Sequence, residues 1–245
     1  MIRAAYSSAA PHRGARLWTG LSYTALLLAA FLVLTVLTAG PLQAVDLALN
    51  EPRDISTIRP GLEIVDRIGQ RAVCLPILGL VAGWAVYRAR SWRPAFVAAV
   101  SVLSVNAFVA VFKFSLERGE PLENEPGFLA GGVMYPSGHT ANVVLVYGLA
   151  AYLWWRYTDS SRDTRWIMAF VVMLLTLIMI ATSLTLRWHW FTDLIGGVLV
   201  GAAALRAATS IDLAIPFTPL TREESQVTRP VARHLSTRRQ KVGSR

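Results

Sequence analysis

Two short polar clusters lie where long apolar runs meet polar sequence, and both contain histidine. The first is Pro-Ser-Gly-His at residues 136–139, and the second, fifty residues further on, contains His189 and Asp193. A histidine carries charge and a transferable proton, which hydrocarbon tolerates poorly, so a histidine at a membrane edge indicates a structural partner or a reaction. Two histidines and a carboxylate favour phosphate chemistry, provided that both clusters face the same side.

His189 and Asp193 are four residues apart at the start of an apolar run. On a helix this spacing lets the carboxylate accept a hydrogen bond from one imidazole nitrogen and leaves the other nitrogen basic. Such a histidine can attack phosphorus and form a phosphohistidine, while His139 protonates the departing oxygen and later activates water. The structural alternative is a capping aspartate beside an interfacial histidine.

Ser137 is a good helix cap, and Pro136 biases the residue before it to an extended conformation, so a helix is expected to begin here with His139 in its first turn. Gly138 has no side chain to block close approach to the unpaired N–H groups of that turn, which favour a bound phosphate. A capped helix with an interfacial histidine remains the alternative.

The composition predicts an all-α bundle of membrane helices. The chain is 54% hydrophobic and 16% charged, with a mean hydropathy of +0.45. This composition differs strongly from that of a soluble domain. Six apolar runs approach the length that crosses a bilayer. They are residues 17–39, 72–87, 94–112, 140–155, 166–186 and 194–205. Pro76 interrupts the second run, for which a kinked span is favoured over a re-entrant loop. The first run has a cleaved signal peptide as its alternative.

The charges orient this bundle. Of the 24 Lys and Arg residues, 17 lie in the N-terminal tail and in segments 88–93, 156–165 and 206–245. Both termini are therefore expected in the cytoplasm of a multi-pass plasma membrane protein, with both histidine clusters on the outer face. This topology and anionic lipids account for the basic excess without nucleic acid. We expect a membrane domain over residues 1–209, with its motif-bearing core at 112–201, and a disordered basic tail at 210–245.

The motifs resemble those of the type 2 phosphatidic acid phosphatase superfamily, which includes vanadium haloperoxidases. Besides the two histidine clusters, Lys113 and Pro121 have the spacing of the first family motif. The resemblance implies six spans, a site at the extracytoplasmic face and no metal or other cofactor. It also implies specific roles: His189 as nucleophile, His139 as acid and base, Asp193 as orienting carboxylate, and Lys113, Ser137 and Gly138 as phosphate contacts.

The sequence departs from the family at two arginines. Glu120 stands where the first motif has Arg, and Ser183 where the third motif has Arg. Loss of one charge-stabilising donor typically costs about 10²–10³ in rate, so substitutes are expected. Arg187 and Arg118 are the candidates, because each lies two residues from a motif position. Arg118 also has ordinary ion-pair partners in the acidic stretch 117–125, which would itself repel phosphate unless paired or unless it admits a cation.

These observations favour a phosphatase that acts on a lipid phosphate or diphosphate in the outer leaflet, such as a polyprenyl diphosphate, phosphatidate or phosphatidylglycerol phosphate. A lipid phosphotransferase with the same intermediate and a noncatalytic lipid-phosphate-binding scaffold remain alternatives, and a haloperoxidase is more distant. The connection 40–71 is long for a loop and is interpreted as a passive cover on the outer surface. The sequence does not determine the head group, the lipid tail or the oligomeric state.

Overall fold

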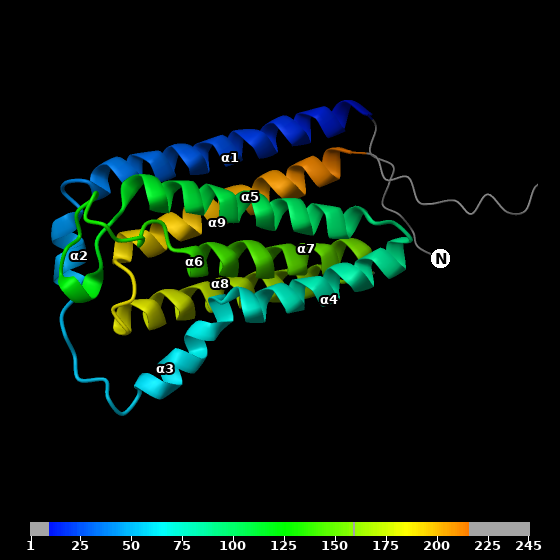
Figure 1. The fold of residues 1–245 in the computed structure, drawn as a ribbon. Helices are drawn as coiled ribbons and strands as arrows, with labels where there is room; N and C mark the ends of the chain where they lie inside the picture. Colours follow the sequence, from blue (N-terminus) through cyan, green and yellow to red (C-terminus); the bar gives the residue numbers. More distant parts are fainter. Residues whose placement is uncertain (1–9, 159, 216–245) are drawn as a thin grey trace, which may run out of the picture.

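A computed structural model of the chain describes residues 10–158 and 160–215, and for residues 10–13 it describes the backbone alone. In this part of the chain the regular structure is helical, without strands (Figure 1). The elements are α1 (Ala10–Thr38), α2 (Gln43–Leu49), α3 (Arg59–Asp66), the 3-10 turn η1 (Arg67–Gly69), α4 (Arg71–Ala89), α5 (Arg93–Leu116), the 3-10 turn η2 (Pro121–Glu123), α6 (Gly138–Asn142), the π-helical turn η3 (Val143–Tyr147), α7 (Gly148–Tyr157), α8 (Arg162–Thr185) and α9 (Phe191–Ala214).

Five of the described helices are long and apolar enough to cross a membrane, namely α1, α4, α5, α8 and α9. The fourth expected span is divided into α6, η3 and α7, so no single helix there reaches that length. These three elements form the centre of the bundle, where Leu145, Leu149 and Leu153 are fully buried at the four-residue spacing of one helix face. The chain is therefore a multi-pass membrane protein with a central broken helix.

The second and sixth apolar runs are both continuous helices. The second run is α4, which continues through Pro76 rather than folding back as a re-entrant loop. The sixth run is α9, which passes Ser210 and reaches Ala214, beyond the expected end of the membrane domain. Asp212 explains this extension, because its buried carboxylate pairs with Arg93 at 2.6 Å and with Arg156 at 2.9 Å. Residues 216–245 of the expected tail lie outside the described residues.

Small residues bring α9 against α6, and this contact joins the two histidine motifs. A Cβ atom on Gly197 would lie 2.5 Å from the backbone oxygen of Ser137, and one on Gly201 would lie 2.7 Å from that of Ala141. Neither distance is sterically possible, so the close approach requires glycine. The amide of Ser137 also donates to the backbone oxygen of Asp193 at 3.0 Å. The start of α6 is thereby fixed to the start of α9.

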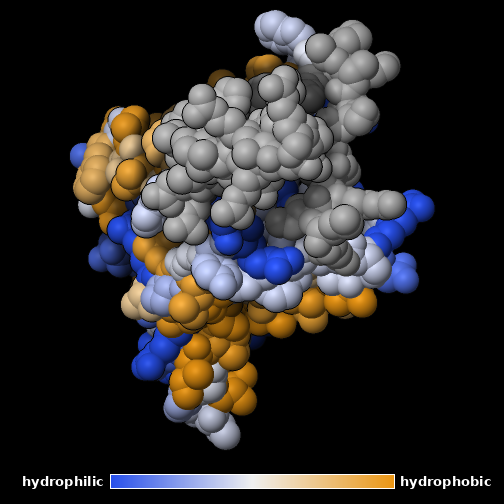
Figure 2. Space-filling model, turned by 90° about the vertical axis from the view of Figure 1, so that its right-hand side faces the viewer, coloured by the Kyte–Doolittle hydropathy of each residue, from blue (hydrophilic) through white to orange (hydrophobic). Residues whose placement is uncertain are grey.

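The two ends of the bundle differ. The short elements α2 and α3 lie at one end, and the start of α1 and the end of α9 lie at the other (Figure 1). In the view onto the end with the chain ends, hydrophilic residues are exposed and hydrophobic residues cover the flanks (Figure 2). This distribution is the one expected for a bundle whose sides face hydrocarbon.

Candidate active site

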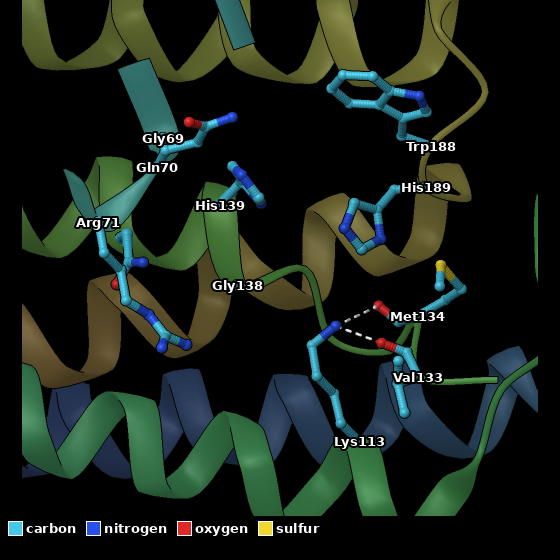
Figure 3. A pocket seen from close by; sticks show the side chains of 11 residues that line it. Gly69, Gln70, Arg71, Lys113, Val133, Met134, Gly138, His139, Trp188 and His189 are labelled. Atoms are coloured by element: carbon cyan, nitrogen blue, oxygen red, sulfur yellow. Dashed lines mark hydrogen bonds between the residues drawn. The ribbon is translucent and has the colours of Figure 1, made fainter. Parts of the chain in front are cut away.

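One pocket of about 450 Å³ receives both histidine motifs (Figure 3). Its lining comes from residues 69–71 between η1 and α4, from Lys113 at the end of α5, from the loop residues 133–134, from α6, and from residues 188–189 before α9. His139 and His189, which are far apart in the sequence, thus face one cavity. Gly138 and Lys113, for which the family resemblance implies phosphate contact, also line the pocket.

His189 is held by the carboxylate that the sequence spacing predicts. Its Nδ1 lies 3.3 Å from Oδ2 of Asp193, and the same oxygen accepts a hydrogen bond of 2.9 Å from the backbone N–H of Trp190. Asp193 is completely buried. Because Nδ1 is occupied by the carboxylate, Nε2 is the ring nitrogen that remains for a reaction in the pocket.

His139 has a carboxylate neighbour that the sequence analysis did not identify. Its Nε2 lies 3.6 Å from Oδ2 of Asp66, the last residue of α3, which is only 2% exposed. The other oxygen of Asp66 accepts a hydrogen bond of 3.3 Å from the hydroxyl of Ser183. Burial raises the pKa of Asp66, and the nearby charge of His139 opposes this shift. Ser183, which stands where the third family motif has Arg, therefore binds the carboxylate that lies beside His139.

Ser137 has the capping geometry predicted for it. Its hydroxyl accepts hydrogen bonds from the backbone N–H of Thr140 at 3.4 Å and from the Thr140 hydroxyl at 3.2 Å. Ser137 is fully buried and does not line the pocket, whereas Gly138 and His139 do. Its contribution in this structure is the start of α6, and the pocket meets that start at Gly138.

Lys113 reaches the pocket from the last turn of α5 (Figure 3). Its ammonium group donates to the backbone oxygens of Val133 and Met134, in the loop that precedes α6. Glu120 is exposed and does not line the pocket. The charge of Lys113 is thus held at the pocket edge by backbone carbonyls, where a phosphate can reach it.

Arg118 occupies a different place from the one expected. It is completely buried, and its guanidinium donates to Asp46 at 2.5 Å, to Thr192 at 2.7 Å and to Asp193. Asp46 in turn accepts from the backbone N–H and the hydroxyl of Thr192. With its donors used inside this network, Arg118 does not line the pocket, and the geometry gives no support for direct phosphate contact. Its place instead fixes the carboxylate behind His189.

Arg187 also points elsewhere. Its guanidinium donates to the side-chain oxygen of Asn50 at 3.1 Å and to the backbone oxygen of Pro121 at 3.0 Å. Its backbone has a positive φ of 56°, just after α8 ends, which is uncommon for a residue with a Cβ. Arg187 therefore connects α8 to the loops at this end and does not line the pocket in the described structure.

Arg71 is the arginine that does line the pocket. It is the first residue of α4, in the connection that the sequence analysis interpreted as a passive cover. The residue type alone does not distinguish Arg71 from other cations. Seven Lys and Arg residues lie in the segments assigned to this side of the membrane, and their spacing relates only some of them to the motifs. The acidic residues of 117–125 are exposed and none of them lines the pocket.

Comparisons with known proteins concern the family and the fold of the chain. No curated protein sequence matches the chain significantly. The structure is similar to that of a transmembrane PAP2-type phosphatidylglycerolphosphate phosphatase from Bacillus subtilis, with a TM-score of 0.68 and 18% sequence identity over 79% of this chain and 97% of that one. At this identity the likeness concerns the fold. The family model of the PAP2 superfamily matches residues 94–215, which include all three motifs. The chain belongs to the PAP2 superfamily.

Proposed function

We propose that this protein hydrolyses a lipid phosphate or diphosphate through a phosphohistidine on His189. The observation that carries this proposal is the shared pocket, in which His189 and His139 face one cavity and each has a buried carboxylate beside it. A histidine with a structural role requires only a hydrogen-bond partner. Two histidines from distant segments that face one solvent-accessible pocket instead provide a nucleophile and an acid for the same reaction.

The chemistry follows from the two ring positions. Nε2 of His189 attacks phosphorus while Asp193 holds the ring through Nδ1, and the P–N bond forms as the bond to the leaving oxygen breaks. His139 gives its proton to that oxygen. A water molecule then attacks the phosphohistidine, with His139 as the base, and phosphate leaves. Lys113 and the N–H groups at Gly138 stabilise the charge that develops on the phosphoryl oxygens.

The position of the pocket favours a lipid substrate. It lies at one end of a bundle whose flanks are apolar, so a lipid can keep its tail in the bilayer while its head group reaches the histidines. Polyprenyl diphosphate, phosphatidate and phosphatidylglycerol phosphate all fit this description. We propose that this end lies on the outer face of the plasma membrane and that both termini are cytoplasmic, because the basic segment 88–93 and the described ends of α1 and α9 lie at the opposite end of the bundle.

The test uses the purified full chain in detergent micelles or nanodiscs, with a small panel of lipid phosphates and diphosphates. We expect the wild-type protein to release phosphate from at least one of these lipids. In His189→Ala the rate of release should fall by at least about 10³-fold, as is typical when a nucleophile is removed. His234→Ala, which changes a histidine of the C-terminal tail, serves as the matched control. Equal weak release from all three proteins would instead support a noncatalytic scaffold.

Labelled water separates hydrolysis from transfer. If water attacks the phosphohistidine, the released phosphate carries one solvent oxygen from each turnover. If an acceptor alcohol becomes phosphorylated and the label is absent from the phosphate, the protein is a phosphotransferase and the hydrolytic step is wrong.

A further inference from the structure

In-line displacement fixes where the leaving group must lie. The attacking and leaving atoms occupy opposite sides of phosphorus, so a leaving group displaced by His189 extends away from that ring, toward the group that protonates it. In the proposed function that group is His139. The part of the pocket beyond His139 is therefore the place for the leaving group.

Arg71 lies in this part of the pocket. In Figure 3, Gln70 and Arg71 are on one side of His139, and His189 and Trp188 are on the other. Arg71 and Lys113 line the same pocket as His139, Arg71 from the start of α4 and Lys113 from the end of α5. The pocket thus carries positive charge at two places, Lys113 near the attacked phosphoryl group and Arg71 on the leaving-group side.

The charge of Arg71 is not explained by the fold. Among the described residues, no carboxylate lies within ion-pairing distance of its guanidinium, and its side chain is exposed to the pocket. It stands in the first turn of α4, which contains no acidic residue. A cation at a helix N-terminus opposes the helix dipole and costs stability. An unpaired arginine in such a place, beside a reacting histidine, fits an anion that arrives with the substrate.

The segment that carries Arg71 is fixed relative to His139. A Cβ atom on Gly69 would lie 2.9 Å from Cβ of His139 and 2.7 Å from the sulfur of Met179, so only glycine permits this packing. The hydroxyl of Tyr147 donates to the backbone oxygen of Ile68 at 3.0 Å. The start of α4 therefore approaches His139 closely, and the base of the Arg71 side chain is held in place.

From these observations we infer that Arg71 binds the second phosphate of a lipid diphosphate and makes this chain selective for diphosphates over monophosphates. The inference rests on the proposed function and names its substrate class. His189 attacks the terminal phosphorus, and the bond from that phosphorus to the bridging oxygen breaks. His139 protonates the bridging oxygen, and the lipid monophosphate leaves with its charge against Arg71. Water then releases phosphate from His189. The leaving group of a lipid monophosphate is instead a neutral alcohol, which the charge of the Arg71 guanidinium does not stabilise.

The experiment compares two substrates with the same tail, farnesyl diphosphate and farnesyl monophosphate, using the full chain in nanodiscs. The wild-type protein is expected to have the higher kcat/KM for the diphosphate. Arg71→Gln is expected to lower that value by about 10²-fold, as for loss of one charge-stabilising donor, and to change the monophosphate value by less than about threefold. Arg71→Lys should keep part of the preference, because it keeps the charge but not the paired geometry.

Arg67→Gln is the matched control, since Arg67 is an exposed arginine of η1, four residues before Arg71, and does not line the pocket. It should leave both values unchanged. An equal fall for both substrates in Arg71→Gln would overturn the inference but leave the phosphatase function intact. So would a wild-type protein that prefers the monophosphate.

If the wild-type protein hydrolyses neither of these substrates nor any lipid of the panel, the proposed function fails, and binding still decides the role of Arg71. The probe is the farnesyl ester of methylenediphosphonate, in which carbon replaces the bridging oxygen. Weaker binding of this probe to Arg71→Gln, with binding of farnesyl monophosphate unchanged, would support the second phosphate site. Equal binding of the probe to the wild-type protein and to Arg71→Gln would contradict the second phosphate site.

Discussion

The two histidine–carboxylate pairs in the pocket are built differently. Both oxygens of Asp193 are bonded, one to Arg118 and the other to the N–H of Trp190 and to His189. Asp66 receives one hydrogen bond, from Ser183, and its second oxygen has no hydrogen-bond partner among the described residues. The 3.6 Å separation of that oxygen from His139 is longer than a hydrogen bond.

This difference suits different tasks. A carboxylate whose lone pairs are satisfied is held in one place, so it can keep a nucleophilic ring in one orientation throughout a reaction. A buried carboxylate with an unsatisfied oxygen responds strongly to the charge on its neighbour, because little else stabilises it. The second arrangement is appropriate beside a histidine that gives up and regains a proton.

The largest effect is expected for Asp193→Asn. An amide can present its N–H₂ group to His189 and stabilise the wrong tautomer, so the nucleophilic nitrogen carries a proton. We expect kcat for the best lipid substrate to fall by about 10³–10⁴-fold, the scale seen when a comparable orienting carboxylate is changed. Steady-state kinetics measure this loss, and thermal unfolding shows that the variant is folded. A loss smaller than tenfold would contradict the orienting role.

Arg118→Met is expected to act mainly on stability. It leaves Asp46 and Asp193 buried without their counter-ion, at a cost of about 3–5 kcal/mol in the free energy of unfolding. Denaturation in detergent measures this cost. Adding Asp46→Asn should recover part of it, because one of the two unpaired charges is then removed. If Arg118 instead touched phosphate, KM would rise in the single variant while stability stayed unchanged.

Asp66→Asn should lower kcat/KM by about 10–100-fold, less than the 10²–10⁴-fold contribution of a general acid itself. Because Asp66 acts through His139, the loss should be greatest for substrates with basic leaving oxygens. An aryl phosphate, which needs little protonation, should lose least. Equal losses for alkyl and aryl substrates would indicate a purely structural role for Asp66.

The same variant has a pH-dependent stability. Burial raises the pKa of Asp66, so the folded protein holds this proton more tightly than the unfolded chain does. The penalty for an ionised Asp66 is absent below the unfolded pKa and grows as pH rises through the folded pKa. Asp66→Asn should therefore gain stability relative to wild type from acid toward neutral pH, although His139, His189 and Ser183 favour the ionised form and reduce the gain. Unfolding temperatures across this pH range measure the difference, and a constant difference would contradict the assignment.

The smallest effect is expected for Arg187→Gln. The guanidinium of Arg187 binds Asn50 and Pro121, so its loss should cost about 0.5–1.5 kcal/mol of stability and change kcat/KM by less than about threefold. Arg53→Gln, in an exposed part of the same end, is a suitable control. A tenfold or greater rise in KM would show that Arg187 reaches the substrate after all.

Much of the fold and part of the site could be predicted from the sequence. Apolar runs predict helices because the bilayer sets their length, and the all-α membrane architecture is confirmed. The contact between His189 and Asp193 is also local, since a spacing of four residues at a helix start brings the two side chains together. Gly197 and Gly201 are small residues four positions apart, a spacing that indicates a close helix contact, and α9 makes this contact with α6.

The arginines could not be assigned in this way. Arg118 and Arg187 are each two residues from a motif position, but both side chains bind groups far away in the sequence. A long flexible side chain can point in many directions from the same backbone, so spacing does not select its partner. Asp66 and Arg71 lie in a connection without any motif, and only the packing of α3 and α4 beside α6 brings them to His139.

The amino-acid sequence thus determined the properties that depend on local order: helix lengths, the family motifs and the pairing of His189 with Asp193. The tertiary structure decided which cations and carboxylates surround the pocket, namely that Arg118 is buried, that Asp66 lies beside His139 and that Arg71 lines the cavity. The physical reason is that charge interactions depend on distance and burial, and both are set by helices that meet only when the chain is folded.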